Sequence, residues 1–355
     1  MNREIIDAQT SYPIECGQGF ALTQLVELFA DRLSKAKGVV IVTDREVSGY
    51  YIASFIQQFE DMEIHPVVVV VEAVQGAKSL DAVKQVYEGL VDANFHESDL
   101  IFALGGGGVI DVAAFAASTF FQGLDYVQIP TSLLAMVDSS VSDKAFLNYQ
   151  SYKDRVSISA KPVYTVIDID FLKTLPSRYR ANGIAQIIRY GLLGNEDLLS
   201  LLMEEQVDME KLIVLSLKTK IRMRTESGRN NLNSGLHEEI KAKRLPYLSF
   251  GQEIGEAIEG HFRFLKYTHG EALALGMLSM YPDSALKELY EKHNLPLLVE
   301  GVTKETLVNR LVRSFPQAGE VSFMALEKTG KPFIKTISTD DTPAVFEDYL
   351  SAICQ

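Results

Sequence analysis

The chain has 355 residues and a formal net charge of −13, a length that predicts two domains at about 100–200 residues per domain. Apolar residues make up 47% and charged residues 23%. These typical globular values exclude disordered, collagen-like and coiled-coil chains. Because an acidic surface repels phosphate groups, we expect no nucleic-acid partner and no membrane-binding face.

Cysteine content and the N-terminal sequence suggest the cellular setting. Cys16 and Cys354 are too few for a disulfide framework or a cysteine-built metal site. The first residues lack the charged-then-apolar pattern of a signal peptide. No apolar run approaches the length of about 18 residues that a membrane span needs. We therefore expect a cytoplasmic protein.

Short β-branched runs alternate with helix-period segments in the first half of the chain. The predicted strands are 39–42, 66–71, 100–104, 126–129 and 163–167, and the predicted helices are 21–36, 46–60, 79–94 and 108–121. Uninterrupted apolar runs are typical of parallel strands that are covered on both faces, and their alternation with helices indicates βαβ units. The sequence therefore predicts an α/β, Rossmann-like doubly wound domain over residues 1–172.

The second half is predicted to be mostly helical, over residues 173–355. Helix-period patterns cover 178–193, 196–206, 208–227, 251–264, 270–279, 284–292 and 303–314, and few strand signals remain. The segment Lys173–Pro176 is the predicted junction. The polar, aperiodic stretch 230–244 is predicted to be an exposed loop.

Four consecutive glycines, 105–108, follow a predicted strand and lead into the helix that carries Asp111. Glycine lets a backbone approach a pyrophosphate, while the free N–H groups at the helix start face its charge. The alternative is a tight turn without a ligand. The strand–glycine–helix context favours a nucleotide site.

Hydroxyl and charged residues follow the next predicted strand. Thr131 and Ser132 are suited to capping a helix, which is their usual role, or to contacting a nucleotide. Asp138, Lys144 and Lys153 lie in or after this segment, in a region predicted to be loop. At the carboxyl edge of a sheet such charges could hold an anionic substrate, and a solvated loop is an equally good interpretation.

The helical half offers a weaker signal. Gln252, Glu256 and Glu259 share one helical face, a pattern that usually marks a solvated surface. His269 opens the next predicted helix, where a capping or core role is more usual than metal ligation. The other histidines are scattered and have no metal-ligand spacing.

Taken in order, these segments resemble the 3-dehydroquinate synthase family, the NAD- and zinc-dependent sugar-phosphate cyclases. The matching stretches are 78–80, 103–107, Asp111, 129–140, 166–168, 171–176, 185–191 and 269–272. The resemblance implies NAD as cofactor, a sugar phosphate as substrate and a homodimer. We predict cofactor contacts at Asp44, Lys78, Gly105, Gly106, Gly107, Asp111, Thr131 and Ser132, and catalytic groups at Asp138, Lys144 and Lys153.

The zinc ligands implied by the resemblance are only partly present. In the family, zinc polarises the hydroxyl that NAD oxidises, and one glutamate and two histidines hold it. Here Gln186 and Gln252 stand at two of these positions, and His269 remains. Glutamine is a weaker zinc donor than carboxylate or imidazole, so we expect ordinary zinc binding to be lost.

Other residues also differ from the family's pattern at positions expected to bind substrate or cofactor. Gln122 stands at a family arginine, Arg189 at a lysine and Glu256 at a second histidine. Ile110 replaces a glycine before Asp111, and a β-branched residue there would narrow the pyrophosphate cradle, since it disfavours a positive φ. We therefore expect NAD binding to be weak, altered or absent.

Two interpretations stay open. In the first, the protein is a divergent enzyme of this family, with Glu253 or Glu256 recruited to a shifted metal. In the second, it is a catalytically silent homologue that acts as a binding or structural protein. The departures make standard synthase activity doubtful under either interpretation.

Overall fold

The computed structural model describes residues 4–6, 12–36, 38–72, 78–150, 152–224, 249–315 and 319–354. The chain forms two compact units, Met1–Pro176 and Ser177–Gln355. The loop predicted at 230–244 lies outside the described residues. In the part of the chain that is described, no helix is both long and apolar enough to cross a membrane.

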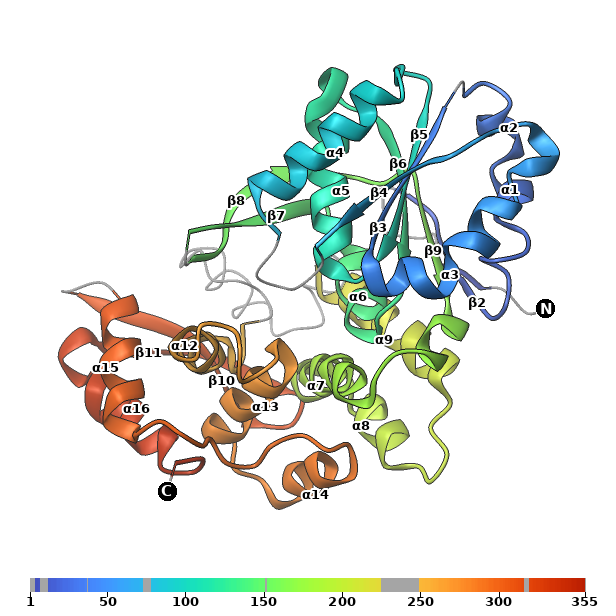
Figure 1. Cartoon of the computed structure of the whole chain (residues 1–355). Helices are drawn as coiled ribbons and strands as arrows, with labels where there is room; N and C mark the ends of the chain where they lie inside the picture. The colour runs from blue at the N-terminus through green and yellow to red at the C-terminus, as the bar shows by residue number, and fades with distance from the viewer. Residues whose placement is uncertain are drawn as a thin grey trace. The chain divides into compact units, whose positions relative to one another are not determined.

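The first unit is built on a largely parallel sheet (Figure 1). Its seven described strands run in the order β1-β2-β9-β6-β5-β3-β4, and only the β1–β2 pair is antiparallel. They are β1 (Glu4–Ile6), β2 (Ile14–Gly17), β3 (Val39–Asp44), β4 (Val67–Val71), β5 (Leu100–Gly105), β6 (Asp125–Pro130) and β9 (Tyr164–Asp168). Because β4 and β5 lie on opposite sides of β3, the winding reverses between β3 and β5, where such sheets bind ligands.

Helices cover both faces of this sheet. In Figure 1, α1 (Leu25–Leu28), α2 (Ala30–Leu33) and α3 (Arg45–Gln57) lie on one side, and α4 (Leu80–Asp92) and α5 (Gly107–Thr119) on the other. The Phe102 ring of β5 packs on the first side against Phe29, Phe55 and Phe59. Its neighbours Ile101 and Ala103 join the core that includes α4 and α5. This two-sided burial explains the uninterrupted apolar run.

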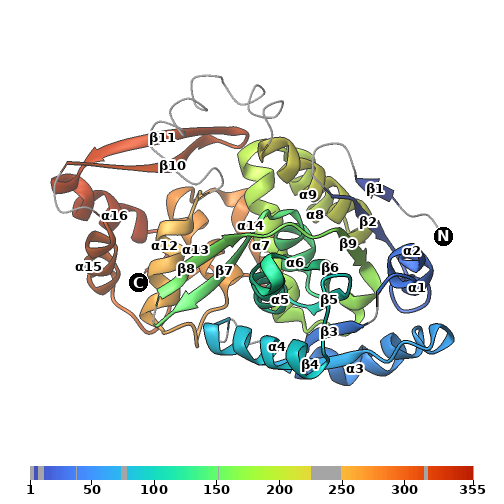
Figure 2. The ribbon, with the colours of Figure 1, turned by 90° about the horizontal axis from the view of Figure 1, so that it is seen from above.

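Three details of the first unit differ from prediction. The strands β1 and β2 were not among the predicted strands. The helix predicted at 21–36 is broken into α1 and α2. The predicted loop around Lys144 and Lys153 is a hairpin of β7 (Lys144–Tyr149) and β8 (Tyr152–Ser159), which lies beside α5 (Figure 2). Shorter elements are α6 (Leu133–Val137) and the 3-10 helices Glu60–Met62, Phe120–Gln122, Ser139–Val141 and Ile169–Lys173.

The second unit is mostly helical, as predicted. Its described helices are α7 (Ser177–Gly194), α8 (Glu196–Met203), α9 (Met209–Arg224), α12 (Gln252–His261), α13 (His269–Met280), α14 (Ser284–Lys292), α15 (Lys304–Ser314) and α16 (Thr342–Leu350). A hairpin of β10 (Glu320–Lys328) and β11 (Lys331–Ser338), the short helix Thr339–Asp341 and α16 were not predicted. Phe323 of β10 packs against Phe346 of α16 and anchors the hairpin. The α/β-plus-helical fold class is confirmed.

Glycines let α12 and α13 approach each other closely. A Cβ atom on Gly276 of α13 would lie 2.0 Å from the carbonyl oxygen of Gly251, and one on Gly255 would lie 3.1 Å from that of Ala272. Gly251 also has a φ of 77°, a conformation that glycine adopts without strain. These contacts hold the polar side chains of α12 beside the start of α13.

We expect Gly276→Ala to lower the free energy of unfolding by about 3 kcal/mol, because its Cβ would overlap backbone. Gly49→Ala is the matched control, since nothing lies within 4 Å of the added Cβ. That change within α3 should be neutral or stabilise by about 0.5–1 kcal/mol. Urea unfolding followed by circular dichroism measures both, and equal effects would contradict the close packing.

Candidate functional site

The candidate nucleotide-binding residues of the first unit gather at the carboxyl edge of its parallel sheet. Thr43 of β3 pairs with Leu104 of β5, so Asp44 and Gly105 lie at the same level on neighbouring strands. The Gly105 carbonyl accepts a hydrogen bond of 3.0 Å from the Thr131 N–H, just after β6. Three strand ends therefore meet where the winding reverses, which is the ligand position in this class of sheet.

The glycine turn leaves an open approach to the start of α5. Gly106 is the N-cap residue, and no side chain caps the helix. Among the described residues, a Cβ on Gly106 would have only the Ser132 hydroxyl within 4 Å, at 3.6 Å. A Cβ on Gly107 would meet the Ser139 hydroxyl at 2.9 Å. The N–H groups of the first turn thus face a space suited to a phosphate.

Ile110 does not narrow this space. It lies inside α5, where its N–H donates to the Gly106 carbonyl at 3.1 Å. Its side chain is 2% exposed and belongs to the apolar core. The position needs no positive φ, so the expectation that a β-branched residue would distort the cradle is wrong.

Two of the predicted cofactor residues act as helix caps. The Asp44 carboxylate accepts a hydrogen bond of 2.9 Å from the Val47 N–H and caps α3. The Ser132 hydroxyl accepts one of 3.3 Å from the Ala135 N–H and caps α6. These bonds fix both side chains at the edge of the sheet. Their contact with a nucleotide stays a prediction.

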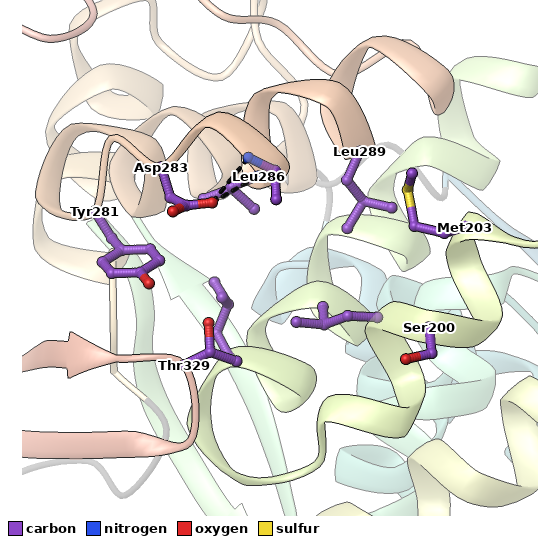
Figure 3. Close-up of a pocket in the computed structure, with 10 residues that line it drawn as sticks. Ser200, Met203, Tyr281, Asp283, Leu286, Leu289 and Thr329 are labelled. Atoms are coloured by element: carbon purple, nitrogen blue, oxygen red, sulfur yellow. Dashed lines mark hydrogen bonds between the residues drawn. The ribbon is translucent and has the colours of Figure 1, made fainter.

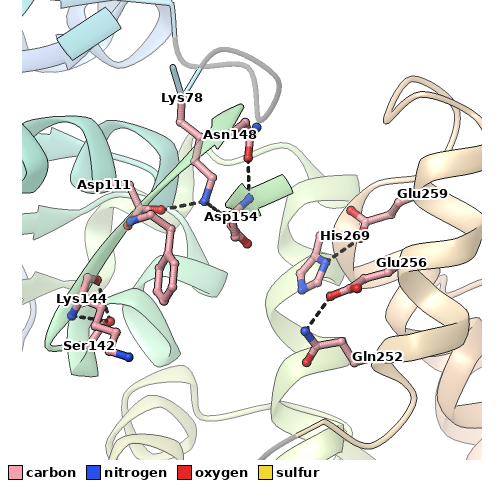
Figure 4. A network of polar contacts seen from close by, with 11 residues as sticks. Lys78, Asp111, Ser142, Lys144, Asn148, Asp154, Gln252, Glu256, Glu259 and His269 are labelled. Atoms are coloured by element: carbon pink, nitrogen blue, oxygen red, sulfur yellow. Dashed lines mark hydrogen bonds and ion pairs between the residues drawn. The ribbon is translucent and has the colours of Figure 1, made fainter. Parts of the chain in front are cut away.

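Lys78, another predicted cofactor residue, is buried between two carboxylates (Figure 4). Its Nζ lies 2.9 Å from Oδ2 of Asp111 and also contacts Oδ1 of Asp154. Burial by itself lowers the pKa of Lys78, but attraction to the two carboxylates outweighs it and raises the pKa above its ordinary value of 10.5. Lys78 is therefore a fixed cation.

Asp154 is the member of this cluster that sequence reasoning missed. The strands β7 and β8 lose register between Leu147 and Tyr149, and Asp154 adopts a φ of 56° in the irregular stretch. Asn148 makes hydrogen bonds to both Asp154 and Lys78. Its side-chain oxygen accepts from the Asp154 N–H at 3.1 Å, and its backbone N–H donates to the Lys78 carbonyl at 2.8 Å. A bulge of this kind redirects a side chain, here onto Lys78.

The predicted catalytic residues lie on separate elements of the first unit. Asp138 ends α6 and donates its N–H to the Leu134 carbonyl at 2.9 Å. Lys144 begins β7, and Lys153 lies on β8 near the turn. The two lysines therefore occupy opposite ends of one hairpin and are not brought together. Their role with Asp138 stays a prediction.

In the second unit, α7 carries Gln186, which stands at the family's glutamate ligand position, and Arg189. Gln186 and Arg189 lie one helical turn apart, and both are buried, with 0% and 6% exposed. The Arg189 guanidinium donates from Nη2 to Oε1 of Gln186 at 2.8 Å. The oxygen of Gln186 thus already accepts a bond from a cation.

The other two positions that correspond to zinc ligands in the family, Gln252 and His269, lie on α12 and at the start of α13 (Figure 4). Gln252 donates from Nε2 to Oε1 of Glu256 at 2.7 Å. Glu259 is 1% exposed, and its Oε2 lies 3.1 Å from Nδ1 of His269. The expected solvated face is therefore wrong for Glu259. Because an ionised carboxylate only accepts hydrogen bonds, Nδ1 carries the proton in this pair.

Glu253, on the same helix, carries a partly enclosed carboxyl group. Its Oε2 is enclosed and has no hydrogen-bond partner in the described parts of the chain. Burial raises the pKa of Glu253 to about 7, and Glu256 adds to the rise while Arg189 opposes it. No group of three or more His, Cys, Asp or Glu side chains that could hold a metal ion occurs within the described residues.

The Lys78–Asp154 contact should show in a double-mutant cycle of Lys78→Met and Asp154→Asn. We expect a coupling of about 1–3 kcal/mol at neutral pH, since Lys78 is buried. Because the pKa of Lys78 is higher in the folded state than its ordinary value of 10.5, the ion pair stabilises the folded protein fully below pH 10.5. This stabilisation is lost as the pH rises through the folded-state pKa of Lys78. The exposed pair Lys84–Glu88 is the control and should couple by no more than about 0.5 kcal/mol. Equal couplings would contradict the buried ion pair.

Glu253 should make the protein less stable as pH rises. Its pKa is raised from 4.5 to about 7, so the folded state keeps a proton that the unfolded state releases between these values. Glu253→Gln should therefore gain about 2 kcal/mol over wild type on going from about pH 5 to about pH 8. Chemical denaturation at both pH values measures it, with exposed Glu291→Gln as the control. A pH-independent difference would contradict the burial of this carboxyl group.

Comparisons with known proteins point to one family over nearly the whole chain. Residues 68–182 match the family model for the 3-dehydroquinate synthase N-terminal region, and residues 183–318 match that for the C-terminal region. A 3-dehydroquinate synthase of Methylacidiphilum infernorum is 29% identical over 99% of both chains. One of Acidithiobacillus ferrooxidans is 31% identical, over 90% of this chain and 86% of its own.

Solved structures share the fold. A 2-deoxy-scyllo-inosose synthase complexed with carbaglucose-6-phosphate, NAD+ and Co2+ superposes with a TM-score of 0.75 at 19% identity, covering 98% of this chain and 99% of its own. The 2-epi-5-epi-valiolone synthase ValA of Streptomyces hygroscopicus, with NAD+ and Zn2+ bound, gives a TM-score of 0.73 at 20% identity, covering 97% and 98%. With the two family models and the near full-length relatives, the chain belongs to the 3-dehydroquinate synthase family of sugar-phosphate cyclases.

Proposed function

We propose that this protein binds a nicotinamide dinucleotide and a sugar phosphate, but does not hold zinc at the family position and has little or no standard 3-dehydroquinate synthase activity. The observation that carries the proposal is the hydrogen bond of 2.8 Å from Arg189 to Gln186. It places a buried guanidinium against the residue that stands at the family's glutamate ligand.

The donor set around this pair does not fit zinc. Gln186 and Gln252 are neutral amides, and each already makes a side-chain hydrogen bond. His269 is the one imidazole at the three family ligand positions. A divalent cation near Gln186 would also be repelled by the positive charge of Arg189, and this repulsion is strong where the surroundings exclude water. Zinc binding would require both the amides and the guanidinium to move.

The nucleotide-binding part of the proposal rests on the first unit. The N-terminus of α5 is uncapped by a side chain, and Gly106 leaves space above it. The structures of 2-deoxy-scyllo-inosose synthase and ValA, which share the fold, contain NAD+. A bound NAD would supply a hydride acceptor. The residues Gly105–Gly107, Thr131 and Ser132 would hold its pyrophosphate, and Asp44 would accept hydrogen bonds from a ribose.

The substrate part rests on charge. We keep Asp138, Lys144 and Lys153 as the proposed substrate contacts; because the two lysines lie at opposite ends of one hairpin, they would not hold the same group of a sugar phosphate. Lysine ammonium groups are suited to phosphate because they donate charge-assisted hydrogen bonds. A homodimeric, cytoplasmic protein remains the expectation for this family member.

Calorimetric titration of NAD into metal-stripped protein, with and without added zinc, tests both parts. We expect NAD to bind with the same affinity in both samples, and zinc to remain well below one ion per chain after dialysis. Gly106→Val should abolish binding by filling the space over α5 while leaving the melting temperature near that of wild type, because no described atom blocks the new side chain's Cβ.

Each other outcome has a distinct meaning. Stoichiometric zinc in the wild-type protein would overturn the metal assignment. Absence of NAD binding would leave a catalytically silent homologue. As the converse test, the triple variant Gln186→Glu, Gln252→His and Arg189→Lys should gain zinc affinity by at least about 100-fold, since it restores an imidazole and a carboxylate donor.

A further inference from the structure

A cavity of about 430 Å³ lies within the second unit (Figure 3). It is lined by the end of α7, by α8 and α14, by the segment that joins α13 to α14, and by the turn between β10 and β11. A volume of this size falls in the range of about 300–1,000 Å³ that small-molecule pockets occupy. None of the predicted site residues lines it.

One end of the cavity is apolar. Met203 of α8 faces Leu289 of α14 across it (Figure 3), and Leu199 of α8 also lines the cavity. Met203 is 41% exposed, so a large apolar side chain is left partly open to solvent at this end. Filling the space with hydrocarbon would remove this apolar surface from water, which favours binding at roughly 25 cal/mol per Å².

The other end carries three hydrogen-bond acceptors. The Asp283 carboxylate uses Oδ1 to accept from the Ala285 and Leu286 N–H groups, at 2.9 and 3.2 Å. Its other oxygen, the Tyr281 hydroxyl and the Thr329 hydroxyl make no hydrogen bond within the described residues. Figure 3 shows all three side chains at this end.

The polar end is held in place by backbone contacts. The Gly330 N–H donates to the Leu192 carbonyl of α7 at 2.8 Å and ties the β10–β11 turn to this helix. The two bonds to Asp283 fix its carboxylate at the start of α14. The Asp283 carboxylate and the turn that carries Thr329 are therefore in place before any ligand enters, which lowers the entropic cost of binding.

We propose that this cavity binds a small apolar primary amine. Its ammonium group would donate to Asp283, Tyr281 and Thr329, and its hydrocarbon part would lie between α8 and α14. An ammonium group has three donors and no acceptor, which matches three acceptors. Asp283 is the one charged residue among those lining the cavity, so an anionic ligand would be repelled. The site is independent of the dinucleotide and of Gln186.

The probe is 2-phenylethylamine, and its anionic counterpart of similar shape is 3-phenylpropanoate. Calorimetry or ligand-observed NMR with the full chain should give a dissociation constant for the amine of about 1 mM or lower, and at least about tenfold weaker binding of the carboxylate. Ser200→Phe, at an exposed position lining the cavity, should abolish binding by filling the space.

Asp283→Asn tests the charge without removing the helix cap, because asparagine caps as well as aspartate. It should weaken amine binding at least about tenfold. Asp208→Asn is the matched control: Asp208 accepts from the Lys211 N–H at 3.0 Å before α9 and does not line the cavity. Equal binding of the two probes, equal effects of the two aspartate variants, or binding that survives Ser200→Phe would each overturn the proposal.

Discussion

Close backbone contact among α7, α12 and α13 is the constraint on which the second unit depends. A Cβ on Gly270 would lie 2.3 Å from the Cα of Asn182 on α7, and one on Gly276 would lie 2.0 Å from the Gly251 carbonyl. Only glycine permits helices to approach so closely. Because the helices are held together there, the side chains of Gln186, Arg189, Glu259 and His269 have little freedom to rearrange.

Two of the buried cations, Lys78 and Arg189, have different surroundings. In the first unit, Lys78 contacts two carboxylates, Asp111 and Asp154, so its charge is more than balanced. In the second, Arg189 donates to the neutral amide of Gln186, and the nearby Glu253 carboxyl holds its proton to about pH 7. Removing charges from water costs free energy unless a partner restores the interaction.

Local sequence patterns predicted the regular parts of the fold. The valine-rich and leucine-rich strands β3 to β6 and the helices α3 to α5 lie within a few residues of the expected ranges. The hairpins β7–β8 and β10–β11 were missed because their strands are partly exposed and interrupted by polar residues. Their apolar residues, such as Ala145 and Leu147, find a buried face only when α5 packs against them.

The sequence by itself determined the family, the parallel sheet, the glycine turn before α5 and the replacement of two expected zinc ligands by glutamine. These features depend on residue type and order along the chain. Only the tertiary structure decided that Asp154 neutralises Lys78, that Glu259 is buried against His269, and that Arg189 bonds to Gln186. Asp154 and Glu259 lie 76 and 10 residues from their partners, and a bulge in one case and a helix–helix contact in the other brings the atoms within hydrogen-bond distance. A side chain's partner is set by packing, which a local pattern does not encode.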